Sequence, residues 1–357
     1  ISIDDTTLPT ITISPMDLVV EGCTENDITN SPMIVAPLSL TRTPISIADA
    51  ATEGLVADDN CNFTIEYSDV ILTAGDCPEL LNIRRRYFVV DDCGNNELGV
   101  ADRQRLISIQ DNTLPVVECP GSADVEGCMA EDIFPAATTL PFSESPTTIS
   151  LAEFMTENGT ATDNCDLTIS YIDVESGTLC DDANPLIVTR TFTVSDNCNT
   201  VTCDQVFTII DTTDPEITCP SDFTVEGCTT ADIINAPETG LAFTTTPQTI
   251  SLPQFEAENG TPTASDNCNF TISYVDVAVV TDPDCPSGIE ITRTFTVEDD
   301  CENIVTCDQI ITIEDTTAPM AVCATGLTFN VDDMCEVTVF ATLLNDGSSD
   351  NLEEGAA

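Results

Sequence analysis

One long stretch occurs twice in the chain almost residue for residue, and it limits the possible folds more than any other feature. It begins with Arg-Thr-Phe-Thr-Val at Arg190 and again at Arg293. In both copies two alternating apolar and polar segments flank an acidic loop with a cysteine, and an Asp-Thr-Thr-x-Pro motif follows. Alternation is typical of half-buried strands, and self-similarity at a fixed period indicates a repeat array. We therefore interpret the chain as a string of β-domains.

The Asp-Thr-Thr-x-Pro motif and its Asp-Asn-Thr-x-Pro variant mark the domain boundaries. Copies begin at Asp5, Asp111, Asp211 and Asp315, so successive copies are about 100 residues apart, the usual size of one domain. The chain opens with the end of such a repeat and closes inside another, so we expect it to be a segment of a longer array. The predicted parts are residues 1–4 as the tail of a preceding repeat, residues 5–110, 111–210 and 211–314 as three immunoglobulin-like repeats, and residues 315–357 as a partial fourth.

Within each repeat the pattern is one of short strands joined by polar turns. In the second repeat the alternating segments include 167–171, 191–194 and 206–210, and a capping box precedes a short helix predicted over Leu151–Asn158. This pattern predicts an all-β chain of tandem immunoglobulin-like antiparallel β-sandwiches joined by short acidic junctions. The last 43 residues, 315–357, are too few to enclose a core. We expect them to be partly ordered.

The charge balance excludes several kinds of partner. The chain has 63 acidic and 8 basic residues, for a net charge of −55. Nucleic acids and anionic membranes both require Lys and Arg, so we predict that the chain binds neither. No apolar run is long enough to span a membrane, which predicts no direct membrane insertion. A hydrophobic content of 41% and a regular strand pattern argue against disorder.

Catalysis is poorly supported by the residue types present. The chain has no His and no Lys, which excludes Ser-His triads, Cys-His dyads, Schiff bases and zincin motifs. A pair of carboxylates could still act as in glycosidases. However, the acidic residues recur with the repeat, whereas a catalytic pair usually occurs once. We predict a protein that is not an enzyme, without catalytic or organic-cofactor residues.

Eighteen cysteines at recurring positions predict an oxidising compartment and a disulfide framework. The second and third repeats have six cysteines each, whereas the first has four and lacks those of its first and last strands. Two positions that are lost together are expected to pair within one repeat. This argument predicts Cys119–Cys203 and Cys219–Cys307.

The other cysteines are assigned from the expected topology. The Asp-Asn-Cys loop and the loop after the Arg-Thr-Phe-Thr-Val strand should lie at one end of a repeat, and Val-Glu-Gly-Cys and the variable loop at the other. Bridged cysteines need Cα atoms within about 7 Å. The predicted pairs are Cys165–Cys198, Cys128–Cys180, Cys61–Cys93, Cys23–Cys77, Cys268–Cys301, Cys228–Cys285 and, in the last segment, Cys323–Cys335. Zinc at Cys198 and Cys203 is the disfavoured alternative, because His is absent and the spacing is unusual.

Acidic segments from several loops should converge at each junction, where they would offer the oxygen ligands that Ca²⁺ prefers. The predicted ligands are Asp4, Asp5, Asp58, Asp59, Asn60, Asp91, Asp92, Asp111, Asp163, Asn164, Asp196, Asn197, Asp211, Asp214, Asp266, Asn267, Asp299, Asp300 and Asp315. The alternative is that these residues only form turns. Glu21, Glu126 and Glu226 are either further ligands from the preceding domain or exposed strand ends.

Three motifs of the chain resemble those of the HYR (hyalin-repeat) family. They are Asp-Thr-Thr-x-Pro-x-Ile-Thr-Cys-Pro, Ala-Thr-Asp-Asn-Cys and Thr-Phe-Thr-Val-Ser-Asp-Asn-Cys. The likeness is greatest to the Cys-rich version in long secreted surface proteins of Bacteroidetes, including gliding-motility adhesins. The resemblance implies immunoglobulin-like stalk or adhesion modules without known catalysis. The long insert before Asp-Asn-Cys and the additional cysteines depart from the minimal family pattern.

These observations predict a non-enzymatic stalk or adhesin array of an extracellular bacterial surface protein or filament. Disulfides within domains and Ca²⁺ between domains would stiffen it. Its partners would be neighbouring repeats of the same chain, with other copies in a fibre or a surface ligand as further partners. The alternative is a set of accessory polysaccharide-binding modules of a larger secreted enzyme. Such modules usually need exposed aromatic side chains, and the chain has no Trp and four Tyr.

Overall fold

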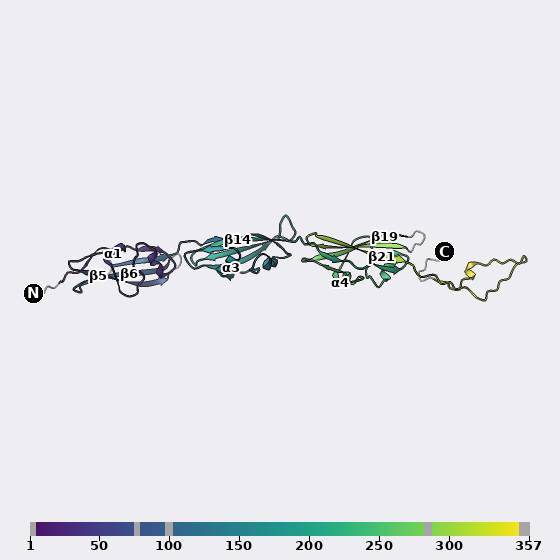
Figure 1. Ribbon diagram of the computed structural model, residues 1–357, viewed down its shortest axis with the longest axis horizontal. Coiled ribbons are helices and arrows are strands. Elements are labelled where there is room, and N and C mark those ends of the chain that lie inside the picture. Colours follow the sequence, from purple (N-terminus) through teal and green to yellow (C-terminus); the bar gives the residue numbers. More distant parts are fainter. Residues whose placement is uncertain (1–4, 75–78, 97–102, 282–287, 350–357) are drawn as a thin grey trace. The chain divides into compact units, whose positions relative to one another are not determined.

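The computed structural model describes residues 5–74, 79–96, 103–281 and 288–349. The chain forms tandem all-β domains, as predicted (Figure 1). The residues of the chain pack into two compact units. The first comprises the described residues up to Val125 with Ile133–Ser176 and Ile187–Thr208, and the second comprises Glu126–Asp132, Gly177–Leu186 and the described residues from Ile209 onward. The division therefore falls inside the second predicted repeat rather than between repeats.

Strands dominate every predicted repeat, and helices are short. The first repeat contains β1(Thr10–Ile13), β2(Leu18–Glu21), η1(Glu25–Asn30), β3(Thr43–Ile45), α1(Ile47–Thr52), β4(Val56–Asp58), β5(Phe63–Ala74), β6(Glu79–Asp91) and β7(Gln104–Gln110). The second contains β8(Val116–Glu118), β9(Ala123–Glu126), η3(Ala130–Asp132), α2(Ile133–Ala136), β10(Thr147–Ile149), α3(Leu151–Thr156), β11(Thr160–Thr162), β12(Thr168–Ser176), β13(Ile187–Ser195) and β14(Thr200–Ile210). From residue 211 onward follow β15(Glu216–Thr218), β16(Phe223–Glu226), η4(Thr230–Asn235), β17(Gln248–Ile250), α4(Leu252–Glu256), β18(Thr263–Ser265), β19(Phe270–Val280), β20(Ile289–Asp299), β21(Ile304–Glu314) and η5(Ala341–Leu343).

Each repeat has one five-stranded and one two-stranded sheet. The large sheets have the orders β2-β7-β6-β5-β3, β10-β12-β13-β14-β9 and β16-β21-β20-β19-β17, and the small sheets are β1-β4, β8-β11 and β15-β18. One feature differs from the predicted antiparallel arrangement, because β2 runs parallel to β7 and β16 runs parallel to β21. The parallel register pairs Glu21 with Gln110. The Glu-Gly-Cys segment and the linker to the next repeat therefore leave the sheet at the same end.

The core of the second repeat lies between its two sheets. Phe154 of α3 packs edge-to-face on Phe192 of β13, with ring centroids 4.9 Å apart. Ala161 of β11 and Ile169 of β12 belong to the same buried cluster. The predicted capping box is present, since Ser150 and Glu153 hydrogen-bond each other's backbone. The alternating sequence pattern thus directs one face of each sheet to a common interior.

The last part of the chain differs from the three repeats. Residues 316–349, all of which the structure describes, have no buried side chain. Cys323 and Cys335 are both exposed and free, so the predicted Cys323–Cys335 bridge is wrong. Among residues 316–349 no sheet brings the two cysteines together. Among the helices of the described residues, none combines the length and apolar character needed to cross a membrane.

Candidate functional site

A glutamate at the end of each short parallel strand holds the linker that follows the repeat. Because β2 ends beside the end of β7, the Glu21 carboxylate lies next to the linker that starts at Asp111. Its Oε1 accepts hydrogen bonds from the backbone N–H groups of Asn112 at 2.8 Å and Thr113 at 3.0 Å, and from Thr113 Oγ1 at 2.8 Å. Burial acts to raise the pKa of Glu21, but these hydrogen bonds outweigh it and hold the pKa below its usual value.

The same contact recurs in the second unit. Glu126 accepts from the backbone N–H of Thr212 at 2.9 Å and from Thr213 Oγ1 at 2.8 Å. Glu226 accepts from Thr316 through the backbone N–H at 3.1 Å and through Oγ1 at 2.7 Å. The glutamates considered as metal ligands therefore bind the linker instead. We call this contact the glutamate clamp.

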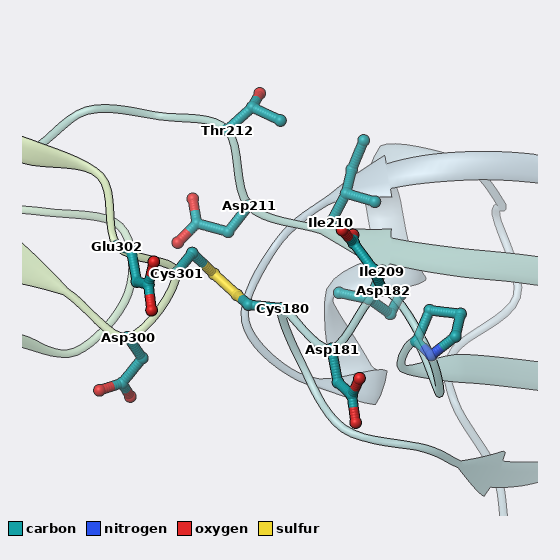
Figure 2. A pocket seen from close by; sticks show the side chains of 11 residues that line it. Cys180, Asp181, Asp182, Ile209, Ile210, Asp211, Thr212, Asp300, Cys301 and Glu302 are labelled. Carbon is teal, nitrogen blue, oxygen red and sulfur yellow. A yellow bond between two sulfur atoms is a disulfide. The ribbon is translucent and has the colours of Figure 1, made fainter.

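Three disulfides connect one predicted repeat to the next. In the first unit Cys23 is bonded to Cys165, with Cα atoms 5.5 Å apart. In the second unit Cys128 is bonded to Cys268, with Cα atoms 5.4 Å apart. The third bridge, Cys180–Cys301, also lies in the second unit and is drawn in Figure 2. Each of the three joins residues that lie more than one repeat length apart in the sequence, at separations of 142, 140 and 121 residues.

Two predicted bridges are present, and most of the others are not. Cys119–Cys203 and Cys219–Cys307 form within repeats, each with Cα atoms 5.8 Å apart. The predicted pairs that the structure contradicts are Cys165–Cys198, Cys128–Cys180, Cys23–Cys77, Cys268–Cys301 and Cys61–Cys93. In the three bridges that join repeats, the loop cysteines are bonded to the adjoining repeat rather than to each other.

Some cysteine predictions reach beyond the described residues. Cys77 and Cys285 both lie outside them, so Cys228–Cys285 stays a prediction. Cys198 and Cys203 are both disulfide-bonded, so neither is available for the alternative zinc site. Cys61 and Cys93, in contrast, are free thiols in the first repeat.

Pairs of carboxylates lie beside the bridges that join repeats. At the first junction one oxygen from Asp111 and one from Asp163 lie within 4.8 Å of each other and of Cys165 Sγ. Asp163 Oδ2 accepts a hydrogen bond from the backbone N–H of Cys165 at 2.8 Å, as the turn interpretation predicts. Its Oδ1 and both oxygens of Asp111 are buried without a hydrogen-bond partner in the described part of the chain. Buried carboxylate oxygens without donors are costly unless a cation or proton compensates them.

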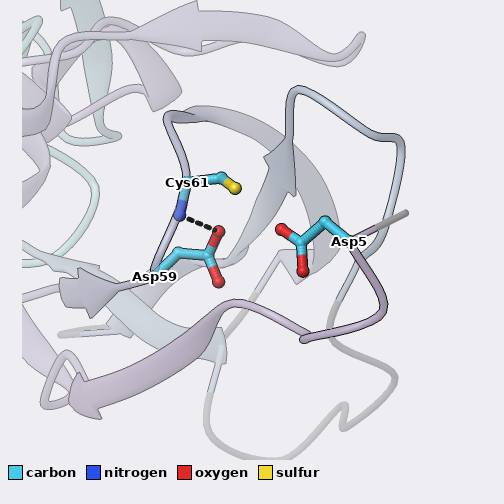
Figure 3. Close-up of side chains that lie close together, drawn as sticks. All are labelled: Asp5, Asp59 and Cys61. Carbon is cyan, nitrogen blue, oxygen red and sulfur yellow. Dashed lines mark hydrogen bonds between the residues drawn. The ribbon is translucent and has the colours of Figure 1, made fainter. Parts of the chain in front are cut away.

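The arrangement occurs at two further positions. Asp211 lies within the same distance limit of Asp266, and also of Asp299. In the first repeat Asp5 and Asp59 form the equivalent pair with Cys61 (Figure 3). Within the described residues, Asp211 Oδ2, Asp266 Oδ1, Asp5 Oδ2 and Asp59 Oδ1 are again buried without hydrogen-bond partners.

The pKa shifts of these groups follow their surroundings. Burial, followed by the charge of Asp196, raises the pKa of Asp111. Burial also raises the pKa of Asp211, against a hydrogen bond from Asn267 that acts to lower it. The pKa of Asp5 is lowered instead, chiefly because the free thiol of Cys61 donates to it, and this contact raises the pKa of Cys61 to about 11.

Of the other predicted ligands, Asp299 approaches Asp211, and the rest do not join the carboxylate pairs. The loop that follows each of three aspartates donates hydrogen bonds to both oxygens of that side chain; they are Asp91, Asp196 and Asp299. The turn interpretation therefore accounts for these three residues, although Asp299 also approaches Asp211. Asp315 accepts from the Thr317 backbone. Asp4 lies outside the described residues. The exposed residues are Asp58, Asn60, Asp92, Asn164, Asn197, Asp214, Asn267 and Asp300.

An acidic pocket of about 430 Å³ surrounds the Cys180–Cys301 bridge within the second unit. Asp181, Asp182 and Asp211 contribute to its lining, together with Asp300 and Glu302. Figure 2 shows Asp211 on one side of the disulfide and Asp181 on the other. The pocket has no basic side chain among its lining residues. Its chemistry suits a cation and opposes an anionic ligand.

No family model matches the chain, and no curated protein matches it. Among solved structures, Drosophila N-cadherin EC1-4 is 12% identical over 86% of this chain and 75% of that chain, with a TM-score of 0.25. Extracellular cadherin domains 1-4 of protocadherin gamma B7 are 11% identical over 89% and 79%, with a TM-score of 0.24. An endo-fucoidan hydrolase from glycoside hydrolase family 107 is 14% identical over 78% and 38%, with a TM-score of 0.22. Likenesses with TM-scores of this size carry no argument about what the chain does.

Proposed function

We propose that the chain is a section of an extracellular, non-enzymatic stalk or adhesin array of a bacterial surface protein, of the kind that HYR-like repeats build. The observation that carries this proposal is the set of disulfides that bond successive repeats to each other. A bridge inside a domain stabilises that domain, whereas a bridge between domains restricts their relative motion and carries tension. The disulfides also fit an oxidising, extracellular location.

Each junction combines two kinds of restraint. The glutamate clamp fixes the linker to the repeat before it, and the disulfide fixes the next repeat to the same end. Linkers without such restraints behave as flexible tethers. In an array that is bonded in this way, the bridges between repeats limit how far the chain lengthens when a domain unfolds, which suits a load-bearing stalk.

We further propose that Ca²⁺ binds at the carboxylate pairs. Asp111 with Asp163, and Asp211 with Asp266, supply the hard oxygen ligands that Ca²⁺ takes, and their buried oxygens have no donors among the described residues. The linker aspartate and the Asp-Asn-Cys aspartate come from segments that belong to one junction. A cation there would neutralise the repulsion between them and stiffen the junction.

Calcium titration of the full chain, followed by calorimetry and elemental analysis, tests this part of the proposal. We expect binding with more than one equivalent, and a double variant Asp111→Asn/Asp163→Asn should lose one of them. At a free Ca²⁺ concentration 100 times the Kd, a site stabilises the folded chain by about 2.7 kcal/mol. Asp124→Asn, which changes an exposed acid that is not among the predicted ligands, is the control. Unchanged stoichiometry in the double variant would refute calcium binding at Asp111 and Asp163.

The alternative of polysaccharide-binding modules finds no support in the tyrosines. The four tyrosines, Tyr67, Tyr87, Tyr171 and Tyr274, are all buried, with exposed fractions of 2%, 1%, 1% and 6%. Sugar rings commonly stack on exposed aromatic faces, so these residues cannot form such a strip. We therefore favour the structural array.

A further inference from the structure

A pocket of about 400 Å³ lies beside Gln205 of β14 in the second repeat, and all of its lining residues belong to the first unit. None of these lining residues is part of a carboxylate pair, a disulfide or a glutamate clamp. Thr138, Glu157 and Gln205 of the lining are buried, whereas Gly121 and Thr156 are exposed. The pocket therefore combines buried polar side chains with residues that solvent reaches.

One acceptor in this lining has no donor. Gln205 is 4% exposed, and its Nε2 donates to the main-chain carbonyl of Gly121 at 2.9 Å. That contact fixes the orientation of the amide, because a flipped amide would place two oxygens against each other. The other amide atom, Oε1, is buried without a hydrogen-bond partner among the described residues. A buried amide oxygen of this kind is costly, so a ligand that donates a hydrogen bond to it is favoured.

The third repeat has the same unpartnered group. Gln309 Nε2 donates to the main-chain carbonyl of Ser221 at 2.8 Å, and Gln309 Oε1 is buried without a partner in the described part of the chain. Glu258, the counterpart of Glu157, leaves its Oε2 without a hydrogen bond there as well, 3.7 Å from Arg293 Nη1. The unpaired acceptor is therefore a property of this position in the repeat and not of one side chain.

The first repeat shows which group fits this position. The counterpart of Gln205 there is Arg105, whose side chain is fully buried. Its guanidinium donates through Nη1 to the main-chain carbonyl of Glu53 at 2.8 Å. Glu53 follows α1 as Glu157 follows α3, and Glu157 lines the pocket. The first repeat thus has a guanidinium of its own at the position where the second repeat has a pocket.

The charge of the pocket favours the same group. The Glu157 carboxylate accepts from Thr138 Oγ1 at 2.6 Å and from the backbone N–H of Thr139 at 2.9 Å. It forms no ion pair within the described residues, whereas Glu53 is paired with Arg85 at 3.1 Å. A cation is therefore preferred to a neutral donor. A guanidinium is preferred to an ammonium, because its planar set of donors can reach separate oxygens at once.

We propose that the pocket beside Gln205, with its counterpart beside Gln309, binds a ligand that carries a guanidinium group. Gln205 Oε1 and the main-chain carbonyl of Glu157 accept hydrogen bonds from this group, and the Glu157 carboxylate balances its charge. The group belongs either to an arginine side chain of another polypeptide or to a small guanidino compound. The site is distinct from the calcium sites proposed above, since both carboxylate oxygens of Glu157 already accept from threonines.

A ligand-detected NMR titration of the full chain tests the proposal, with ethylguanidinium as the probe and ethylammonium as the matched control. Saturating Ca²⁺ and about 0.15 M salt screen the acidic surface. We expect ethylguanidinium to bind about tenfold more tightly than ethylammonium. The double variant Gln205→Leu/Gln309→Leu should weaken ethylguanidinium binding about tenfold, because it removes the unpaired acceptors. Gln248→Leu, at an exposed glutamine of β17, is the control and should bind as wild type does.

A second double variant tests the comparison with the first repeat. Gln205→Arg/Gln309→Arg supplies the guanidinium from the chain itself, as Arg105 does, and should abolish binding while the circular dichroism spectrum stays that of wild type.

The source of the group is distinguished by the peptide acetyl-Gly-Arg-Gly-amide. Binding of this peptide as tight as that of ethylguanidinium would support an arginine of a polypeptide, and its exclusion would support a small guanidino compound. Equal binding of ethylguanidinium and ethylammonium would overturn the proposal, because the acidic surface would then attract any cation. Binding that both double variants leave unchanged would overturn it as well.

Discussion

Arg190 places a full positive charge in the interior of the second repeat, where its side chain is completely buried. Its guanidinium donates to both oxygens of Asp173, at 2.7 and 2.8 Å, and lies over the ring of Tyr171. Arg85 with Asp69, and Arg293 with Asp276, repeat this pair in the other repeats. Removing one member of a buried pair leaves the other charge without compensation.

We therefore predict that Asp173→Ala destabilises the second repeat by about 3–5 kcal/mol. The measurement is chemical denaturation of the full chain with its disulfides intact, followed by circular dichroism. Glu175→Ala, at an exposed position on the same strand, should change the stability little. A loss of less than about 1 kcal/mol for Asp173→Ala would show that water or a rearranged side chain compensates Arg190.

At the residue scale, sequence reasoning identified the aspartates but could not separate their roles. Asp163 and Asp196 both precede an Asn-Cys pair. In the structure Asp196 uses both oxygens within its own loop, whereas Asp163 leaves one oxygen facing Asp111. The difference depends on which loop lies beside the linker. That placement is tertiary, and no local pattern encodes it.

At the scale of elements, the short parallel strand determines where the linker is held. Period-two alternation predicted the long strands, but it does not say which neighbour an edge strand takes or in which direction. The parallel pairing of β16 with β21 brings Glu226 next to Glu314 and so next to the linker at Thr316. The glutamate clamp was therefore missed, although Val-Glu-Gly-Cys occurs in each of the three full repeats, ahead of the junctions at Asp111, Asp211 and Asp315.

The clamp predicts a local effect on the linker. Glu126→Ala removes the acceptor for the backbone N–H groups of Thr212 and Thr213. Each exposed hydrogen bond of this kind contributes about 1 kcal/mol, so hydrogen exchange at these two amides should become roughly fivefold faster. Glu216→Ala, an exposed acid on β15, is the control and should leave both amides unchanged. Equal exchange in wild type and Glu126→Ala would mean that the clamp does not order the linker.

At the scale of the whole molecule, the disulfide pattern shows how far comparison of repeats can reach. Cys119 and Cys203 were paired correctly because their counterparts are both missing from the first repeat. The other positions occur in every full repeat, so their presence is equally compatible with pairing inside a repeat and with pairing to the next one. The assumption that each repeat closes on itself gave the wrong choice. The two ends of a repeat were predicted well enough to suggest the alternative, since each end meets a neighbouring repeat.

The bridges between repeats predict how the chain responds to force. Tension applied at its two ends follows the backbone to Cys23, crosses to Cys165, continues to Cys180 and crosses to Cys301. The two chain segments between the bridged cysteines, with sequence separations of 142 and 121 residues, are thereby shielded from extension. At about 3.4 Å per extended residue, reduction of these bridges should release roughly 900 Å of additional length.

Single-molecule force spectroscopy of the full chain, before and after a reducing agent, measures this length. The double variant Cys119→Ser/Cys203→Ser is the matched control. Cys119 lies in one shielded segment and Cys203 in the other, so their bridge is not on the path of the tension. With its other bridges still oxidised, this variant should unfold at lower force than wild type. It should nevertheless reach the same extension as the oxidised wild type. If the oxidised wild type already extends to the reduced length, tension does not pass through the bridges between repeats. The array would then depend on the glutamate clamps and bound cations to keep its junctions in place.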